Sequence, residues 1–134
     1  MRLIICFFIL FLISCSDTDD DIACKPVIFD KEMFDSQDNF GLQLLDYKLE
    51  GNCLKVNLGF SGCSDDHKIE LVTDGITPAT DPFNVITCDF YDHNPEMCEA
   101  YFTVEKEFDI QPIRDRYDGQ PEIILRNNGT IIIL

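Results

Sequence analysis

Hydrophobic and polar residues alternate along much of the chain with the period of two that is typical of a β-strand. The clearest case is the segment 54–60, where Leu54, Val56, Leu58 and Phe60 alternate with polar or small residues. Successive side chains of a strand point to opposite faces of a sheet, so this pattern predicts a half-buried strand. Looser alternation predicts strands over residues 40–49, 68–73, 83–91 and 100–110, and only residues 30–36 have a faint helical pattern.

The C-terminal residues predict a β-hairpin. Two apolar runs, 122–126 and 130–134, flank Asn127-Asn128-Gly129. Asn-Gly supplies the positive φ angles that a type I′ turn requires, so the two runs are expected to pair as antiparallel strands. Because both runs are apolar on both faces, at least one of them is expected in the middle of a sheet.

Together these segments predict an all-β fold. About six to eight short strands, with turns about every 8–12 residues, are typical of an antiparallel β-sandwich or a closely related barrel. The chain has 134 residues, of which 46% are hydrophobic, which suits one domain with a real core. We therefore expect a single β-sandwich domain over residues 24–134, preceded by two segments of different composition.

Residues 1–14 have the composition of a secretory signal peptide. Arg2 precedes the apolar run 3–13, which is shorter than the about 20 residues that a membrane-spanning helix needs. The residues Leu12-Ile13-Ser14-Cys15 resemble a bacterial lipobox, in which the cysteine becomes the lipidated first residue of the mature chain. The resemblance implies lipidation of Cys15, and two or three acyl chains hold a protein firmly on a membrane. The alternative is an ordinary signal peptide, after which Cys15 enters a disulfide.

Residues 15–23 form an acidic segment that predicts a solvated tether between the lipid and the domain. This segment also resembles the acidic stretch that follows the lipidated cysteine of Bacteroidetes-type lipoproteins, where it can direct transport to the outer face of the outer membrane. The resemblance implies a lipid-anchored protein on the cell surface. The residues that it assigns to the export signal are Ser16, Asp17, Asp19, Asp20 and Asp21.

The charge of the chain narrows the choice of partners. The chain has 25 acidic and 10 basic side chains, a formal net charge of −15. Binding of nucleic acid needs a clustered Lys/Arg surface, and electrostatic attraction to anionic membranes needs the same, so both are unfavourable here. We expect membrane contact through the lipid anchor alone, and a protein or a small molecule as the ligand.

The seven cysteines favour an oxidising compartment. The strand predicted over 54–60 holds Cys53 and Cys63 too far apart for a disulfide, which needs Cα atoms within about 7 Å. Cys88 and Cys98 lie symmetrically about His93, so a hairpin that pairs them stays open as an alternative. If Cys6 is removed with the signal peptide and Cys15 is lipidated, an odd number remains: Cys24, Cys53, Cys63, Cys88 and Cys98.

Four stretches of the domain resemble a family of small Bacteroidetes-type surface lipoproteins, mostly uncharacterised and often described with NigD-like β-sandwich lipoproteins. The stretches are Asn52-Cys53-Leu54-Lys55-Val56, Ser61-Gly62-Cys63, Cys98-Glu99-Ala100 and residues 108–113. The resemblance extends from about Cys24 to the end of the chain. It implies the disulfides Cys24–Cys53 and Cys63–Cys98, leaves Cys88 as an additional thiol, and implies a bacteriocin-immunity-type or accessory role.

Loop histidines and carboxylates provide the alternative chemistry. Asp66, His67, Asp92 and His93 would form a two-histidine metal site if their loops meet. The more ordinary interpretation is that these residues belong to solvated loops, because neither histidine lies in a ligand spacing such as His-Glu-x-x-His. Asp65, Asp66, Asp89, Asp92 and Asn94 offer the hard oxygen ligands that calcium prefers. Their spacing does not match that of a known calcium loop.

An activated nucleophile is not evident in the sequence. Ser61-Gly62-Cys63-Ser64 lacks the strand-to-helix elbow of a hydrolase, and no glycine-rich phosphate loop is present. The sequence therefore favours a non-enzymatic, lipid-anchored protein of the cell envelope with a binding, accessory or immunity-type role and no cofactor. The alternative is a metal-binding protein or metal-dependent hydrolase that uses the loop histidines and aspartates.

Overall fold

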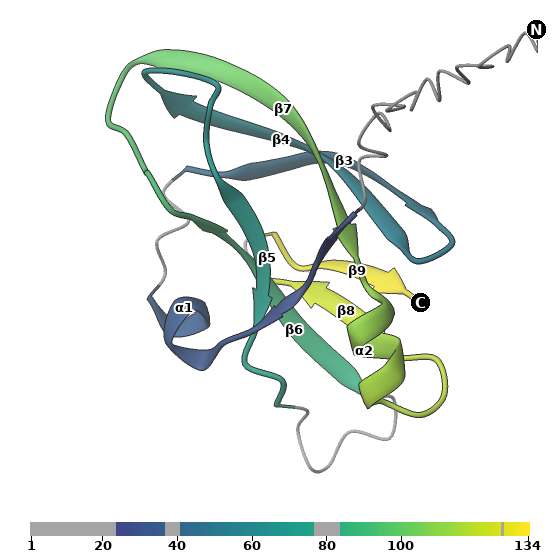
Figure 1. Cartoon of the computed structure of the whole chain (residues 1–134). Coiled ribbons are helices and arrows are strands. Elements are labelled where there is room, and N and C mark those ends of the chain that lie inside the picture. The colour runs from purple at the N-terminus through teal and green to yellow at the C-terminus, as the bar shows by residue number, and fades with distance from the viewer. Residues whose placement is uncertain (1–23, 37–40, 77–83, 127) are drawn as a thin grey trace, which may run out of the picture.

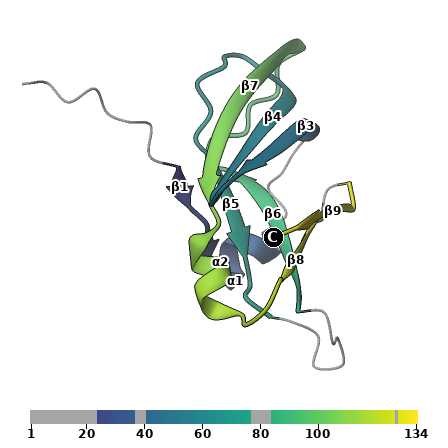
Figure 2. The ribbon, with the colours of Figure 1, turned by 90° about the vertical axis from the view of Figure 1, so that its right-hand side faces the viewer.

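The structure is a computed structural model that describes residues 24–36, 41–76, 84–126 and 128–134. These residues form two β-sheets packed face to face, seen from two sides in Figures 1 and 2. One sheet contains, in spatial order, β1 (Lys25–Pro26), β7 (Ala100–Asp109), β4 (Cys53–Gly62) and β3 (Gln43–Glu50). The other contains β2 (Ile28–Phe29), β5 (Ile69–Thr73), β6 (Val85–Asp92), β8 (Glu122–Leu125) and β9 (Thr130–Ile133).

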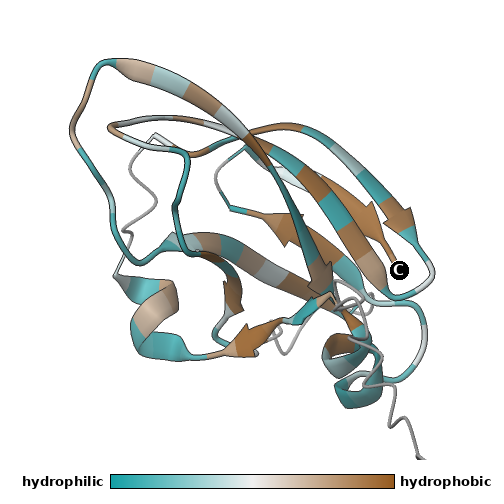
Figure 3. Cartoon of the chain, turned by 45° about the horizontal axis from the view of Figure 1, so that its top comes forward, coloured by the Kyte–Doolittle hydropathy of each residue, from teal (hydrophilic) through white to brown (hydrophobic). Residues whose placement is uncertain are grey.

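The longest pairing in the molecule joins β4 and β7. The two strands run antiparallel over ten residue pairs, from Cys53 opposite Asp109 to Gly62 opposite Ala100. Leu54, Val56, Leu58 and Phe60 face the second sheet and are at most 2% exposed, which confirms the half-buried strand predicted from their alternation. Figure 3 shows the corresponding bands of hydrophobic and hydrophilic residues along the long strands.

The core lies between the two sheets. Phe108 of β7 meets Phe90 of β6 with ring centroids 6.0 Å apart, and both rings are about 1% exposed. Side chains of alternate residues on β5, β6, β8 and β9 complete this layer, because a strand directs every second side chain to the same face. They include Ile69, Leu71, Ile86, Cys88, Ile123, Leu125 and Ile132.

The all-β prediction is confirmed, but the sheets are mixed rather than purely antiparallel. β1 runs parallel to β7, β2 runs parallel to β5, and β6 runs parallel to β8. The first two pairs arise because residues 25–29 pass from one sheet to the other in a single extended segment. The third arises because the chain crosses between the sheets through α2 (Gln111–Arg116) before it enters β8.

Two short helices flank the sandwich. α1 (Lys31–Asp35) matches the helical turn predicted at residues 30–36, and the Asp30 side chain caps it by accepting a hydrogen bond from the Met33 N–H. Phe34 of this helix is buried and lies under the Arg126 guanidinium, 3.6 Å from the ring centroid. Sequence alternation gives no sign of α2, because six residues that begin Gln-Pro are too few to show a helical period.

The C-terminal hairpin forms as predicted, but its turn differs. β8 pairs with β9 from Glu122 opposite Ile133 to Leu125 opposite Thr130, and β8 lies between β6 and β9. The connecting loop therefore has four residues, and among its described residues only Gly129 has a positive φ, of +69°. The prediction of a type I′ turn is wrong, since that turn closes a two-residue loop with two positive φ angles.

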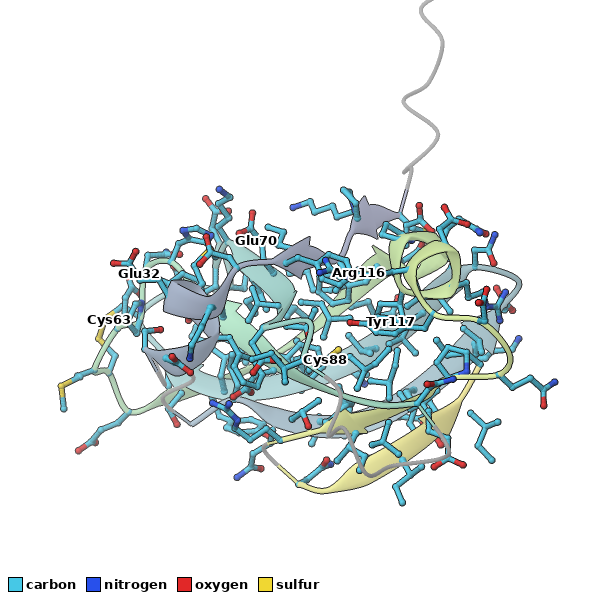
Figure 4. The ribbon with its side chains drawn as sticks, turned by 90° about the horizontal axis from the view of Figure 1, so that it is seen from below. Glu32, Cys63, Glu70, Cys88, Arg116 and Tyr117 are labelled. Carbon is cyan, nitrogen blue, oxygen red and sulfur yellow. A yellow bond between two sulfur atoms is a disulfide. The ribbon has the colours of Figure 1, made fainter. Side chains whose placement is uncertain are left out.

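The structure contains the disulfides Cys24–Cys53 and Cys63–Cys98, with Cα–Cα distances of 5.8 and 5.0 Å. These are the pairs that the family resemblance implies. Cys88 is a free, fully buried thiol on β6, located between the layers in Figure 4. Burial raises the pKa of Cys88 to about 12, so the reactive thiolate is negligible at neutral pH.

The predicted signal peptide (residues 1–14) and tether (15–23) lie outside the described residues. The same holds for the lipidation site Cys15 and for the export-signal residues Ser16, Asp17, Asp19, Asp20 and Asp21. Among the residues that the structure describes, no helix is long and apolar enough to cross a membrane.

Removal of the Cys63–Cys98 bridge is expected to destabilise the domain more than removal of the free thiol. The bridge closes a loop with a sequence separation of 35 residues, so restraint of the unfolded chain predicts a loss of about 3–4 kcal/mol for the double substitution Cys63→Ser/Cys98→Ser. Cys88→Ala removes one buried sulfur and is expected to cost about 1 kcal/mol. Urea unfolding monitored by circular dichroism measures both, and equal losses would contradict this role for the bridge.

Candidate functional site

Most of the histidines and acids singled out in the sequence lie at one end of the sandwich, in loops 63–68 and 93–99. We call these two loops the stapled end, because Cys63–Cys98 joins them. The Lys68 N–H donates to Asn94 Oδ1 (3.0 Å), the His93 N–H donates to the Lys68 carbonyl (3.1 Å), and Asn94 Nδ2 donates to the Asp66 carbonyl (3.2 Å). The loops therefore meet, through backbone groups and the side chain of Asn94.

His67 is the buried residue at the stapled end, and it is only 2% exposed. Its Nδ1 lies 2.6 Å from Asp92 Oδ2, and its ring packs on Phe60 with centroids 4.5 Å apart. Its Nε2 has no hydrogen-bond partner among the described residues and lies 3.5 Å from Glu96 Oε2, which accepts a hydrogen bond from the Cys63 N–H. The imidazole is thus a structural element that fills the space under both loops.

His93 belongs to a different pair. Its Nε2 lies 2.5 Å from Glu70 Oε2, and Lys68 Nζ lies 3.3 Å from the other oxygen of the same carboxylate. Burial opposes the ionisation of Glu70, but the hydrogen bonds with His93 and Lys68 outweigh it and hold the pKa of Glu70 below its ordinary value. This second pair is partly exposed to solvent.

The predicted metal ligands do not gather around one point. His67 pairs with Asp92, whereas His93 pairs with Glu70. In the described part of the chain, one group of residues brings three possible ligand atoms within 4.8 Å of one another, and it consists of Cys24, Cys53 and Glu107. The two sulfurs of that group form a disulfide and offer no thiolate. The candidate calcium ligands are divided as well, because Asp89 and Asp92 are three residues apart on β6 and point to opposite faces.

A shallow groove lies on the outer face of the four-stranded sheet and has a volume of about 230 Å³. The register of the strands explains why charged residues line this groove. Lys48, Lys55 and Glu107 are cross-strand neighbours on the face opposite to the core. Asp46, Asn57 and Glu105 form the next row along the same strands. The full lining consists of Asp46, Tyr47, Lys48, Lys55, Val56, Asn57, Glu105, Lys106 and Glu107.

Ion pairs order the charged side chains of the groove. Lys55 Nζ lies 3.0 Å from Glu50 Oε2 and 3.4 Å from Glu107 Oε1, and Lys48 Nζ lies 2.5 Å from Glu50 Oε1. The hydrogen bonds to Glu50 and Glu107 raise the pKa of Lys55, and those from Lys48 and Lys55 lower the pKa of Glu50. Exposed pairs of this kind contribute little to stability, so their main effect is to present fixed charges to solvent.

Apolar side chains lie beside the groove on the same face. Tyr101 of β7 is 56% exposed and Leu45 of β3 is 47% exposed. Gly59 of β4 separates them, and a Cβ atom there would lie 2.0 Å from the Tyr101 hydroxyl oxygen and 3.2 Å from Leu45. Glycine therefore leaves the space in which the tyrosine lies across the sheet. We call Leu45, Gly59, Tyr101 and the adjoining groove the outer-face patch.

Sequence reasoning missed the outer-face patch. Its residues come from three strands, and Tyr101 and Leu45 are ordinary strand residues until β3 and β7 are placed on either side of β4. The one local signal was Gly59, a glycine inside a strand pattern, which often marks the close approach of another group. Large aromatic side chains beside ordered charges are typical of protein-binding surfaces.

No family model matches the chain, and no curated protein matches it significantly in sequence. Two crystal structures from Bacteroides share its fold. A DUF1344 protein of unknown function from Bacteroides vulgatus has a TM-score of 0.56 and 15% identity over 83% of this chain and 55% of its own. A NigD-like immunity protein from Bacteroides caccae has a TM-score of 0.55 and 13% identity over 83% of this chain and 58% of its own.

These likenesses are consistent with the NigD-like resemblance seen in the sequence. At 13–15% identity they establish a shared fold. The chain spans a little over half the length of each of the two proteins, at 55% and 58%. The fold defines the class as an all-β sandwich of the kind found in these Bacteroides proteins.

Loss of the Asp92 carboxylate is expected to destabilise the stapled end. Asp92→Ala leaves the buried His67 Nδ1 without its partner, and removal of one member of a buried hydrogen-bonded pair costs about 3 kcal/mol. Glu70→Ala is the matched control, since it removes the carboxylate from the more exposed His93 and is expected to cost about 1 kcal/mol or less. Chemical unfolding compares the two, and a larger loss for Glu70→Ala would contradict the structural role of His67.

Proposed function

We propose that this protein is a lipid-anchored protein of the cell envelope that binds a protein partner, without catalysis, through the outer-face patch. The observation that carries the proposal is the exposed Tyr101 lying over Gly59 next to the charged groove. Tyrosine supplies a large contact area with few rotatable bonds, which makes it a frequent centre of binding energy in protein interfaces. The ion pairs around Lys55 provide the polar border that such a centre needs.

The arrangement of the titratable groups supports binding rather than catalysis. An acid–base catalyst must reach the proton that it transfers, whereas His67 is 2% exposed and covered by both loops of the stapled end. In the groove, Lys55 is engaged by Glu50 and Glu107. Cys88 is buried with a raised pKa and cannot act as a nucleophile there.

The anchor is proposed from the sequence. The lipobox-like Leu12-Ile13-Ser14-Cys15 assigns the lipid to Cys15, and the aspartate-rich segment 16–21 follows it directly. The described domain begins at Cys24, so only residues 16–23 would separate the lipid from the sandwich. This order supports a domain held close to the outer membrane surface by a short tether.

The role that we propose is immunity-type or accessory. One protein that shares the fold is a NigD-like immunity protein, and an immunity function requires recognition of another molecule rather than its chemical conversion. The net charge of −15 favours a basic partner, because complementary charge accelerates encounter and disfavours acidic competitors. A basic polypeptide that reaches the cell surface would be both a molecule to recognise and a partner of complementary charge.

Photocrosslinking in intact cells tests the binding surface. The photoreactive residue p-benzoylphenylalanine replaces Tyr101 in the full chain, and we expect a light-dependent adduct with one protein, identified by mass spectrometry. The same residue at the exposed Glu32 of α1 is the control, because α1 lies on the other sheet. The adduct at position 101 is expected to weaken at least fivefold when Glu105→Lys reverses a negative charge of the adjoining groove, because the proposed partner is basic. Equal adducts at both positions, or none at position 101, would refute the proposed surface.

Metabolic labelling tests the anchor separately. Cells that produce the full chain are grown with radioactive palmitate, and label is expected in the protein and absent from Cys15→Ser. Cys88→Ser is the matched control, since it also removes one thiol but lies in the folded domain. Retention of label by Cys15→Ser would show that the lipobox interpretation is wrong without affecting the proposed binding surface.

A further inference from the structure

The Nε2 nitrogen of His67 is a buried polar atom without a hydrogen-bond partner among the described residues. It lies at the stapled end of the sandwich, which the labelled Cys63 marks in Figure 4. The His67 side chain is 1% exposed, so bulk water does not reach this nitrogen. A buried polar group without a partner costs free energy, and in folded proteins such a group often marks the place of a bound water or ion.

The other ring nitrogen of His67 determines what Nε2 can bind. Nδ1 lies 2.6 Å from Asp92 Oδ2, and a carboxylate oxygen accepts a hydrogen bond, so Nδ1 carries the proton. In the neutral imidazole, Nε2 then presents a lone pair on the side away from Asp92. Histidines that bind metal ions commonly donate their second ring N–H to a carboxylate, which fixes the tautomer and orients the ring.

Glu96 places a carboxylate beside this lone pair. Its Oε2 lies 3.5 Å from His67 Nε2, which is long for a hydrogen bond. Two atoms bound at about 2.1 Å to one tetrahedral ion lie about 3.4 Å apart, which matches this separation. The Cys63 N–H donates to the same oxygen at 2.9 Å and positions it, and the Glu96 side chain is 34% exposed, which gives an ion access from solvent.

Gly62 leaves space next to the same nitrogen. A Cβ atom at Gly62 would lie 3.0 Å from His67 Nε2 and 3.4 Å from the Ser64 carbonyl oxygen. The φ angle of Gly62 is not positive, so its backbone conformation does not require glycine. The absence of a side chain therefore serves the space around Nε2, which a carbonyl oxygen also borders.

We propose that His67 Nε2 and the Glu96 carboxylate bind a divalent zinc-type ion. An imidazole nitrogen combined with a carboxylate oxygen suits zinc, whereas calcium and magnesium take oxygen ligands. The Ser64 carbonyl and water complete a four-coordinate site. The ion joins loop 63–68 to loop 93–99 next to the disulfide that already links them.

This site differs from the two-histidine site that the sequence suggested, because His93 remains with Glu70 and takes no part in it. It also goes beyond the proposed binding function, since it uses no residue of the outer-face patch. Its role is structural: the ion holds the two loops together and gives the buried nitrogen a partner.

The charges around His67 favour a cation. Asp92 and Glu96 flank the imidazole, and among the described residues no lysine or arginine forms an ion pair with either carboxylate. A divalent ion between His67 and Glu96 supplies the missing positive charge where burial makes an unbalanced negative charge costly. The net charge of −15 also attracts cations to the surface of the protein.

Calorimetric titration with zinc chloride tests the site. The full chain is purified in detergent without a histidine tag and stripped with a chelator, and we expect one zinc ion to bind per chain. Glu96→Gln keeps an acceptor for the Cys63 N–H but is expected to weaken zinc binding at least tenfold. Glu70→Gln is the matched control, since it changes the carboxylate of the other histidine pair and is expected to leave the affinity unchanged. No binding by the unsubstituted chain, or equal affinity in Glu96→Gln, would overturn the proposal.

Nuclear magnetic resonance of the ring nitrogens tests the same site without relying on a variant of its ligands. The chain has two histidines, so long-range ¹H–¹⁵N spectra of histidine-labelled full chain are assigned with His93→Gln. Zinc is expected to shift the Nε2 resonance of His67, while Nδ1 stays protonated and the His93 resonances do not move. A shift confined to His93 would contradict the proposed ligands. A proton on His67 Nε2 that zinc does not displace would show a charged imidazole between Asp92 and Glu96 in place of a metal site.

Discussion

The antiparallel pairing of β4 with β7 is the constraint on which the rest of the structure depends. Its ten residue pairs send Leu54, Val56, Leu58 and Phe60 into the core and place Lys55 and its outward neighbours on the surface. Because side chains alternate along a strand, a slip of one residue would exchange the two sets. Disulfides restrain both ends of the pairing, through Cys53 at one end and through Cys63 and Cys98 at the other. One register therefore determines both the core and the outer-face patch.

The strands could be predicted from the sequence because their alternation is local, whereas the pairing of the strands is not. Residues 85–88 lie parallel to residues 122–125, and nothing within either segment indicates the other. The switch of residues 25–29 between sheets is equally invisible, since two residues in each sheet are too few for a pattern. The hairpin at Gly129 was predicted, but its loop length follows from the register of the strands rather than from the Asn-Gly pair.

The same limit applies to the candidate site. The sequence singled out His67 and His93, but their separate partners, Asp92 and Glu70, depend on how loops 63–68 and 93–99 meet. Lys106 interrupts the apolar alternation along β7. Its Nζ donates a hydrogen bond to the His67 carbonyl at 3.1 Å, a contact that depends on the fold and cannot be seen in the sequence. The cysteine pairs came from the family resemblance, since geometry along the chain left the Cys88–Cys98 alternative open.

The position of the first disulfide determines how the domain responds to a pull on its N-terminal side. Cys24 precedes β1, which is only two residues long and would peel away from β7 under a small force. The covalent bond to Cys53 bypasses β1 and transfers the force to the first residue of β4. Tension directed along β4 then loads its ten-residue pairing with β7 in shear, where many hydrogen bonds resist together rather than one after another. The domain is therefore reinforced mechanically at the point where drag from the surroundings would reach it through the proposed tether.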